Sequence, residues 1–209
     1  MNIAIYLALA VVAYLLGSIP FGLILVRIVR GEDVRLTGSG NIGATNVARS
    51  GGAKLGITTL LLDALKGYVA VLIALLASHR NSGVDLGFAA SLAALCAILG
   101  HVFPVWLKFR GGKGVATAVG AFVGLAPRAV LVVLAIFLVI VLISRYVSLG
   151  SIVASAVFPL LAFFLYRSES SPAGLAVMLG ASLLIILKHK TNIRRLLDGT
   201  ENRLQFHKS

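Results

Sequence analysis

The sequence has 209 residues, of which 59% are hydrophobic and only 12% are charged. That charged share is about half of the usual share in a soluble domain. Together with a mean hydropathy of +1.00, it excludes an ordinary soluble protein and predicts a single all-α integral membrane domain over residues 1–209. The net charge of +12 does not indicate a nucleic-acid partner, because no basic run is interleaved with aromatic residues. Basic residues of so apolar a chain usually mark cytoplasmic loops that face anionic lipid.

Seven apolar segments follow one another, and each is predicted to be a transmembrane helix. The first, Ile3–Val26, has no charge and is long enough to cross a bilayer of roughly 30 Å. No Lys or Arg precedes it, and it is longer than a signal-peptide core, so we expect it to be retained. Pro20 is expected to kink or break it. The fourth segment is short and is expected to be tilted, partial or packed against protein. The remaining segments are Leu55–Ala77, Leu86–Leu107, Val115–Ala126 (the fourth), Ala129–Ser144, Tyr146–Tyr166 and Ser170–Leu187.

Seven crossings place the two termini on opposite sides, and the positive-inside rule chooses the orientation. With the N-terminus outside and the C-terminus in the cytoplasm, 15 of the 19 Lys and Arg residues are cytoplasmic. The outer loops then hold only Arg80, Arg128 and Arg167, and Lys66 lies within a segment. The cytoplasmic residues are Arg27, Arg30, Arg35, Arg49, Lys54, Lys108, Arg110, Lys113, Arg145, Lys188, Lys190, Arg194, Arg195, Arg203 and Lys208. Every polar motif is therefore predicted to face the cytoplasm.

The stretch Thr37–Arg49 is rich in glycine, hydroxyl and amide groups between two apolar segments. Glycines let successive N–H groups point at one anion, and Arg49 adds a fixed positive charge. One interpretation is a phosphate-binding loop at the membrane surface. The other is a polar connector between two helices.

A second glycine-rich loop, Phe109–Thr117, surrounds Lys113 with three glycines. It is not a nucleotide-binding P-loop, because Lys113 is followed by glycine and position 107 is not glycine. Close backbone approach to an anion is one interpretation, and a basic cytoplasmic loop is the other. His101, just upstream, is expected to pack at the interface rather than to act in catalysis. No second histidine or carboxylate stands near it at ligand spacing, so we expect no metal and no cofactor.

Three further groups of polar residues lie in or beside the apolar segments. Asp63 and Lys66 are three residues apart on one helical face, where a mutual structural pair is the first interpretation and a floor under the polar site the second. Ser148 and Ser151 follow a tight turn and are expected to be N-caps, anion ligands or both. His189 and Asn192 share a face if the last helix continues through them. The basic stretch around them is otherwise typical of a topology anchor.

Taken together, these motifs resemble the bacterial acyl-phosphate-dependent glycerol-3-phosphate acyltransferase family. The resemblance extends from the first segment to the last. It rests on GSIPFG (residues 17–22), GSGNIGATN (38–46), DALKG (63–67), GH (100–101), GGKGVAT (111–117) and KH (188–189) with Asn192.

The resemblance implies transfer of a fatty acyl group from acyl phosphate to glycerol 3-phosphate, giving 1-acyl-glycerol 3-phosphate and phosphate. This would be the first step of phospholipid synthesis, at the cytoplasmic face of a bacterial inner membrane in contact with lipid. The acyl phosphate is assigned to Gly38–Asn46, with backbone N–H groups and Ser39 holding the leaving phosphate. Lys113 and Arg49 would grip glycerol 3-phosphate, and His189 and Asn192 would orient its hydroxyl. The assigned residues also include Gly38, Gly40, Asn41, Gly43, Thr45, Asn46, Gly112, Ser148 and Ser151.

Two alternatives follow from the same residues. Acyltransferases that use acyl-CoA or acyl-carrier protein often carry a His-x4-Asp dyad, and no histidine of this chain is followed by Asp at that spacing. A small transporter of anionic solutes is the alternative from another class of protein. It would need polar residues through the bilayer, whereas only Asp63 and Lys66 are charged at depth.

Overall fold

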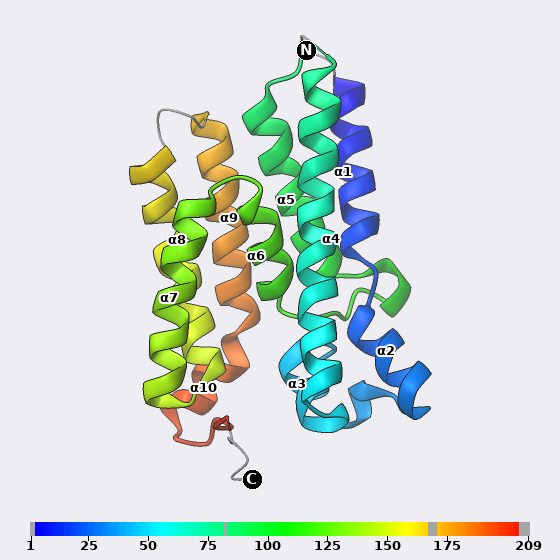
Figure 1. Cartoon of the computed structure of the whole chain (residues 1–209), viewed down its shortest axis with the longest axis vertical. Coiled ribbons are helices and arrows are strands. Elements are labelled where there is room, and N and C mark those ends of the chain that lie inside the picture. The colour runs from blue at the N-terminus through cyan, green and yellow to red at the C-terminus, as the bar shows by residue number, and fades with distance from the viewer. Residues whose placement is uncertain (1–2, 82, 167–170, 205–209) are drawn as a thin grey trace.

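The computed structural model describes residues 3–81, 83–166 and 171–204, and over these residues it is helical without any β-strand. The long helices run side by side along the longest axis of the molecule (Figure 1). The all-α prediction is confirmed for this part of the chain. Arg167, Lys208 and Ser170, on which parts of the charge count and of the seventh segment depend, lie outside the described residues.

The first apolar segment is broken, as Pro20 predicts. Helix α1 covers Ile3–Gly17 and helix α2 covers Phe21–Arg30. Proline has no N–H and its ring clashes with the preceding turn, so the helix cannot continue through it. Helix α2 leaves the direction of α1 and turns toward the rim of the molecule (Figure 1). It has an apolar and a basic face, and Gly31 ends it in the left-handed conformation with φ 68°.

The other predicted segments are helices with nearly the predicted bounds. They are α4 (Ala53–His79), α5 (Leu86–Val102), α6 (Val115–Val123), α7 (Pro127–Ser144), α8 (Val147–Tyr166) and α9 (Pro172–Lys188). Four short elements were not predicted. They are η1 (Val34–Leu36), α3 (Ala44–Gly51), η2 (Val105–Leu107) and α10 (Lys190–Leu197).

Within the described residues, five segments are long and apolar enough to cross a membrane, and a sixth is added if the bent pair of α9 and α10 counts as one. The stretch from α1 through α2 counts as one of the five. Helix α6 has nine residues, which rise only about 14 Å. It packs chiefly against α4, so the expectation of a short segment packed against protein is confirmed.

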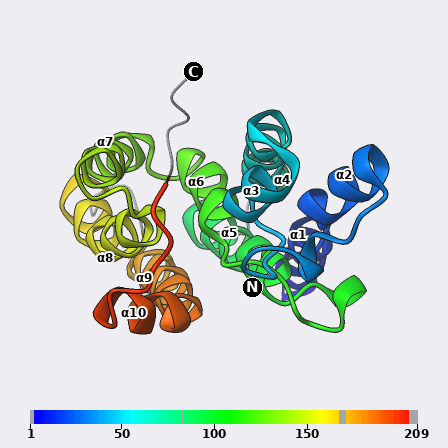
Figure 2. The same ribbon diagram turned by 90° about the horizontal axis from the view of Figure 1, so that it is seen from below.

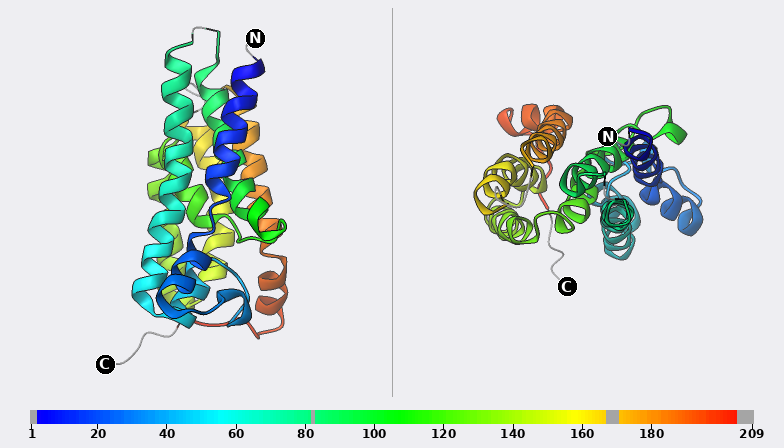
Figure 3. Two further views of the ribbon diagram at one scale, coloured as in Figure 1. Left: turned by 90° about the vertical axis from the view of Figure 1, so that its right-hand side faces the viewer. Right: turned by 90° about the horizontal axis from the view of Figure 1, so that it is seen from above.

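The helices form two groups joined by α5. Helices α1, α4 and α5 pack together with α6 on α4, while α7, α8 and α9 form the second group and α9 contacts α5 (Figures 2 and 3). The larger core joins both groups and includes Ile98, Met178 and the stacked rings of Phe122 and Phe158. A separate small core lies under the first glycine-rich stretch, in Leu23, Val26, Val34, Ile42 and Val47.

The polar motifs gather at one end of the molecule. Helices α2, α3 and α10 lie at the lower end in Figure 1, and the chain from α5 to α6 passes above them. The turns that join α4 to α5 and α6 to α7 lie toward the other end. The fold therefore places the two glycine-rich stretches and the last short helix at the same end.

Candidate active site

Only the first half of the predicted stretch Thr37–Arg49 is irregular, and these residues, Thr37–Gly43, are called the first glycine loop. From Ala44 the chain is helical, so Thr45, Asn46 and Arg49 stand on α3. Gly38 and Gly40 have φ values of 57° and 69°, which favour glycine. Gly38, Ser39 and Gly40 are exposed at the surface of the molecule. The expectation that the whole stretch is an irregular loop is therefore corrected.

Asn46 holds the first glycine loop together. Its side chain is 2% exposed, and its Oδ1 accepts from the Ser39 N–H at 2.8 Å. Its Nδ2 donates to the carbonyls of Val34 and Thr37, both at 3.1 Å, and of Asn41 at 2.9 Å. The amide is fully occupied by the loop's own backbone. Asn46 therefore positions the loop instead of offering a free donor at its surface.

Three backbone N–H groups expected to point at an anion bond within the loop instead. The Ser39 N–H goes to Asn46, the Gly40 N–H to the Thr37 carbonyl at 3.0 Å, and the Gly43 N–H to Asn41 Oδ1 at 2.8 Å. The Ser39 hydroxyl remains on the exposed face of the loop. This face lies beside the first turn of α3, whose N–H groups carry partial positive charge.

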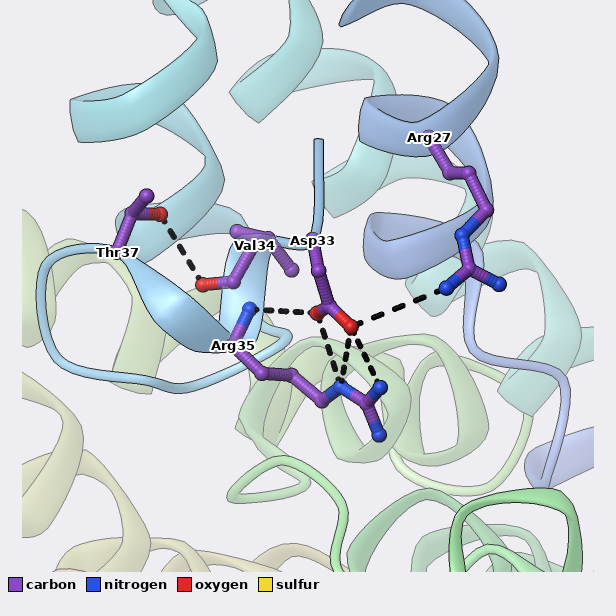
Figure 4. Close-up of polar contacts among 5 residues, drawn as sticks. All are labelled: Arg27, Asp33, Val34, Arg35 and Thr37. Carbon is purple, nitrogen blue, oxygen red and sulfur yellow. Dashed lines mark hydrogen bonds and ion pairs between the residues drawn. The ribbon is translucent and has the colours of Figure 1, made fainter. Parts of the chain in front are cut away.

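The entry into the loop is fixed by an ion pair that the sequence analysis did not single out (Figure 4). Arg35 Nε donates to Asp33 Oδ1 at 2.9 Å, and Arg27 lies 3.9 Å from Asp33 Oδ2. The hydrogen bond from Arg35 lowers the pKa of Asp33 to about 2. Thr37 Oγ1 donates to the Val34 carbonyl at 3.2 Å. The loop is thus fixed at its entry.

The second glycine loop, residues Lys108–Gly114, carries Lys113 to a group of side chains from the end of the chain. Lys113 Nζ donates to Asn192 Oδ1 at 2.6 Å across 79 positions of sequence. Burial lowers the pKa of Lys113 to about 8. The charge of Glu201 opposes that shift, whereas Arg195 and Arg49 add to it. Arg49 of α3 therefore acts electrostatically on Lys113 of the second loop.

Glu201 lies at the centre of this group and was not predicted. Its Oε1 accepts from Ser148 Oγ at 2.8 Å and from Asn192 Nδ2 at 2.7 Å, and its Oε2 accepts from Arg195 Nε at 2.7 Å. Burial acts to raise the pKa of Glu201, but these hydrogen bonds outweigh it and the pKa lies below its usual value. The available signal was an acidic residue just after the turn at Gly199, followed by Arg203 and Lys208.

The tail that carries Glu201 is docked on the start of α8. The Leu204 N–H donates to the Arg145 carbonyl at 2.7 Å, and the Thr200 N–H donates to the Arg195 carbonyl at 2.8 Å. Arg203 Nε donates to Tyr146 Oη at 3.1 Å. These contacts bring Ser148 of α8 and Asn192 of α10 to the same carboxylate.

His189 stands at the junction of α9 and α10, which bend by 53°. The last long helix does not continue through His189 and Asn192, so the condition for a shared face on one helix is not met. His189 is 2% exposed, and its Nδ1 lies 2.8 Å from the Ile185 carbonyl. Because a carbonyl only accepts, Nδ1 carries the hydrogen and the neutral ring keeps Nε2 as an acceptor. Both Lys113 and Glu201 act on this ring electrostatically.

Ser148 and Ser151 are not N-caps, because α8 begins at Val147 and both lie inside it. Ser151 Oγ donates to the Val147 carbonyl at 2.9 Å within the helix. Of the two, only Ser148 reaches the Glu201 carboxylate.

The predicted residues therefore form two clusters. The first glycine loop with α3 is one, and Lys113, Ser148 and Asn192 with the nearby His189 are the other. Two residues that were not predicted as site residues, Arg195 and Glu201, complete the second cluster. Gly112 is buried beneath Lys113. In the described part of the chain, no three His, Cys, Asp or Glu side chains are placed to hold a metal ion.

Comparison with known proteins gives consistent matches. A family model described as glycerol-3-phosphate acyltransferase matches residues 7–199. The glycerol-3-phosphate acyltransferase of Syntrophotalea carbinolica is 52% identical over 194 residues, covering 92% of this chain and 94% of that relative. The one from Geobacter sulfurreducens is 50% identical over 202 residues, covering 95% and 97%.

Two solved structures have the same fold. The crystal structure of PlsY (YgiH), an integral membrane glycerol 3-phosphate acyltransferase, in its glycerol 3-phosphate form aligns with a TM-score of 0.85 at 40% identity, covering 96% of each chain. The lysophosphatidic acid form of that protein aligns with a TM-score of 0.83 at 38% identity, covering 96% of this chain and 95% of the other.

Proposed function

Because this chain belongs to the glycerol-3-phosphate acyltransferase family, we propose that it transfers a fatty acyl group from acyl phosphate to glycerol 3-phosphate. The products are 1-acyl-glycerol 3-phosphate and inorganic phosphate. The observation that carries this proposal is the partly buried Lys113, which is held by Asn192 and lies in the field of Arg49 and Arg195. So much positive charge at a partly buried point favours a dense anion, and both proposed substrates carry phosphate.

Glycerol 3-phosphate is assigned to the cluster around Lys113. Lys113 and Arg49 would bind its phosphate through charge-assisted hydrogen bonds. His189 Nε2 is left as an acceptor, which suits it to receive a hydrogen bond from the attacking hydroxyl. Asn192 already donates to Glu201 and accepts from Lys113, so its role is to fix Lys113. Ser148 also donates to Glu201, so its role is to hold that carboxylate in place.

Acyl phosphate is assigned to the first glycine loop, where the leaving phosphate would meet Ser39 Oγ and the first-turn N–H groups of α3 at Ala44 and Thr45. Helix N-termini favour such anions. Asn46 and Asn41 shape the loop, and Gly38, Gly40 and Gly43 keep its backbone accessible. Both loops lie at the same end of the molecule (Figure 1), and Arg49 of α3 acts electrostatically on Lys113. These two observations support neighbouring sites for the two phosphate groups.

In the proposed step, the hydroxyl oxygen attacks the acyl carbonyl carbon. The bond from that carbon to the phosphate oxygen breaks, and its electron pair leaves with phosphate. The hydroxyl proton passes to the leaving phosphate, because a positive charge on the buried His189 ring beside Lys113 would be costly. An acyl phosphate is already activated, so positioning supplies much of the rate enhancement without a strong protein base.

We further place the N-terminus outside and the active site in the cytoplasm of a bacterial inner membrane, with seven crossings. The distribution of Lys and Arg supports this orientation. Helices α6 to α9 also alternate in direction between the two ends of the molecule (Figure 1). With Cys96 replaced by alanine, a cysteine at Asn81 should react with an impermeant reagent on intact cells, and one at Ser50 should not. The reverse pattern would invert the topology.

The donor is tested with purified protein and glycerol 3-phosphate. Product should form with acyl phosphate and not with acyl-CoA or acyl-carrier protein, and inorganic phosphate should compete with acyl phosphate. Comparable rates with acyl-CoA would contradict the assignment. A transporter would instead accumulate anionic solute in sealed vesicles without acyl transfer.

A further inference from the structure

Three ionisable side chains lie buried between α4 and α5, outside the site described above. Asp63, Lys66 and His101 are 1%, 4% and 4% exposed. Lys66 Nζ lies 2.7 Å from Asp63 Oδ1, so the expected mutual pair is present. His101, in the last turn of α5, completes a group of three, with its Nδ1 3.0 Å from Lys66 Nζ.

The contacts of Lys66 fix the state of His101. An ammonium group has three hydrogens and no acceptor. Lys66 donates to the Ile19 carbonyl at 2.7 Å and to His101 Nδ1, and it forms an ion pair with Asp63. His101 Nδ1 also lies 3.5 Å from Asp63 Oδ1, a longer contact than the one to Lys66. Because the Lys66 ammonium can only donate, we assign Nδ1 as the acceptor and the hydrogen of the neutral imidazole to Nε2. The group is thus neutral overall, which suits its burial within the membrane domain.

On one side, this group supports the second glycine loop. The Gly112 N–H donates to the His101 carbonyl at 3.0 Å, and the Gly111 N–H donates to the Val102 carbonyl at 3.1 Å. The ring of His101 fills the space beside Gly112 so closely that a Cβ there would overlap Nε2. The backbone immediately before Lys113 therefore rests on His101.

On the other side, the group supports the first glycine loop. Because the helix breaks at Pro20, the Ile19 carbonyl is outside the regular helical bonding, and Lys66 Nζ donates a hydrogen bond to it. Lys66 Nζ also lies 5.7 Å from the centre of the Phe21 ring. One residue further, Gly22 packs against the Ile42 carbonyl with no room for a Cβ. The start of α2 thus connects Lys66 to the first loop.

From these contacts we propose that Asp63, Lys66 and His101 form a buried positioning unit that sets the second glycine loop, and hence Lys113, against the first glycine loop. None of the three touches the two loops' proposed substrates. This role rests on the proposed function, because the unit would affect catalysis by setting the distance between the two phosphate sites. Small errors in such a distance are costly in group transfer.

The test uses His101→Asn in the purified, full-length enzyme. Asparagine retains an acceptor near the Nδ1 position for Lys66, but removes the ring from Gly112. We expect the KM for glycerol 3-phosphate to rise about tenfold, with a smaller change in the KM for acyl phosphate. Ser91→Ala is the matched control, because Ser91 is 1% exposed on the same helix and far from the loop. It should leave both constants unchanged.

A double-mutant cycle separates positioning from general destabilisation. If His101 acts through Lys113, then His101→Asn should have little further effect on that KM in the Lys113→Ala background. Equal factors in the two backgrounds would overturn the proposal. A Lys113→Ala enzyme with an unchanged KM for glycerol 3-phosphate would instead remove Lys113 from the proposed substrate site.

Amide hydrogen exchange decides the structural part without any assay of activity. In the wild-type protein, the amides of Gly111 and Gly112 should exchange as slowly as those of α5, and His101→Asn should accelerate them. If the wild-type amides exchange as fast as those of Gly38–Gly40, the proposed support does not exist. The wild-type exchange measurement tests the support even if the His101→Asn protein does not fold. Its result does not depend on which acyl donor the enzyme uses.

Discussion

The two glycine loops are built in opposite ways. The first is held by bonds between residues close in sequence, since Asn46 reaches carbonyls only 5 to 12 positions away. The second delivers Lys113 to a partner 79 positions away, and Ser148 meets Glu201 across 53 positions. The first loop takes its shape mainly from local hydrogen bonds, whereas the second site is assembled from side chains that are distant in the sequence.

The first loop therefore contributes to the proposed site through its shape, and the second site contributes through its charges. The first loop supplies backbone geometry and the hydroxyls of Thr37 and Ser39, and none of its residues from Thr37 to Gly43 is ionisable. The second site is a network of charged side chains whose partners come from α8, α10 and the tail. Changes to the first loop should therefore act on loop geometry, and changes to the second on phosphate affinity and its pH dependence.

The largest effect is expected from Asn46→Ala, which removes the frame of the first loop. Four hydrogen bonds are lost, and the carbonyls of Val34, Thr37 and Asn41 each lose a partner. These bonds contribute roughly 1 kcal/mol each to the stability of the loop's shape. Because the loop can position the acyl phosphate only in that shape, we expect a hundredfold or greater fall in kcat/KM. Steady-state kinetics with both substrates would measure it.

Asn81→Ala is the control for that change, because Asn81 makes a single side-chain bond to the Ala77 carbonyl at the opposite end of the molecule. It should retain wild-type kinetics. Near-normal activity of folded Asn46→Ala protein would show that the first loop does not depend on this amide.

The second prediction concerns the charges of the other site. Lys113→Ala and Arg49→Ala should each lower kcat/KM for glycerol 3-phosphate about tenfold to hundredfold, because each removes a charge-assisted contact of roughly 1.5–3 kcal/mol. Arg49→Lys should recover only part of the loss, since lysine lacks the bidentate fork. Unlike Asn46→Ala, these variants should leave the KM for acyl phosphate close to normal. An equal rise in both constants would contradict the division between shape and charge.

The same difference explains what the sequence predicted. The long helices follow from continuous apolar runs, and the break at Pro20 follows from its ring. Helix α3 was missed because its glycine-rich approach indicates a loop, although Asn46 and Val47 share a buried face. Helix α10 is short and polar, so its existence depends on docking. Glu201 was missed because its partners, from Ser148 to Arg195, meet only in the folded chain.

The third prediction is a pH dependence carried by Lys113. Lysine binds phosphate as the ammonium, and its lowered pKa of about 8 moves the loss of that charge down from the usual value near 10.5. The value of kcat/KM for glycerol 3-phosphate should therefore fall above pH 8, by about tenfold at pH 9. Lys113→Arg keeps its charge over this range and should flatten the alkaline limb. An unchanged limb in that variant would assign the titration to another group.

The smallest effect is expected from a methyl group on the first loop, in the substitution Gly40→Ala. Gly31 is its matched control, because the two glycines have φ values of 69° and 68°. Alanine in that conformation costs roughly 1–2 kcal/mol at either position, so both variants should lose similar thermal stability. A Cβ at Gly31 meets nothing within 4 Å, whereas one at Gly40 lies 3.2 Å from the Arg35 carbonyl. Because the first loop acts by its shape, Gly40→Ala should lower turnover severalfold while Gly31→Ala retains it. Equal turnover in the two variants would mean that catalysis tolerates a displaced first loop. The claim that the first loop acts through its shape would then be wrong.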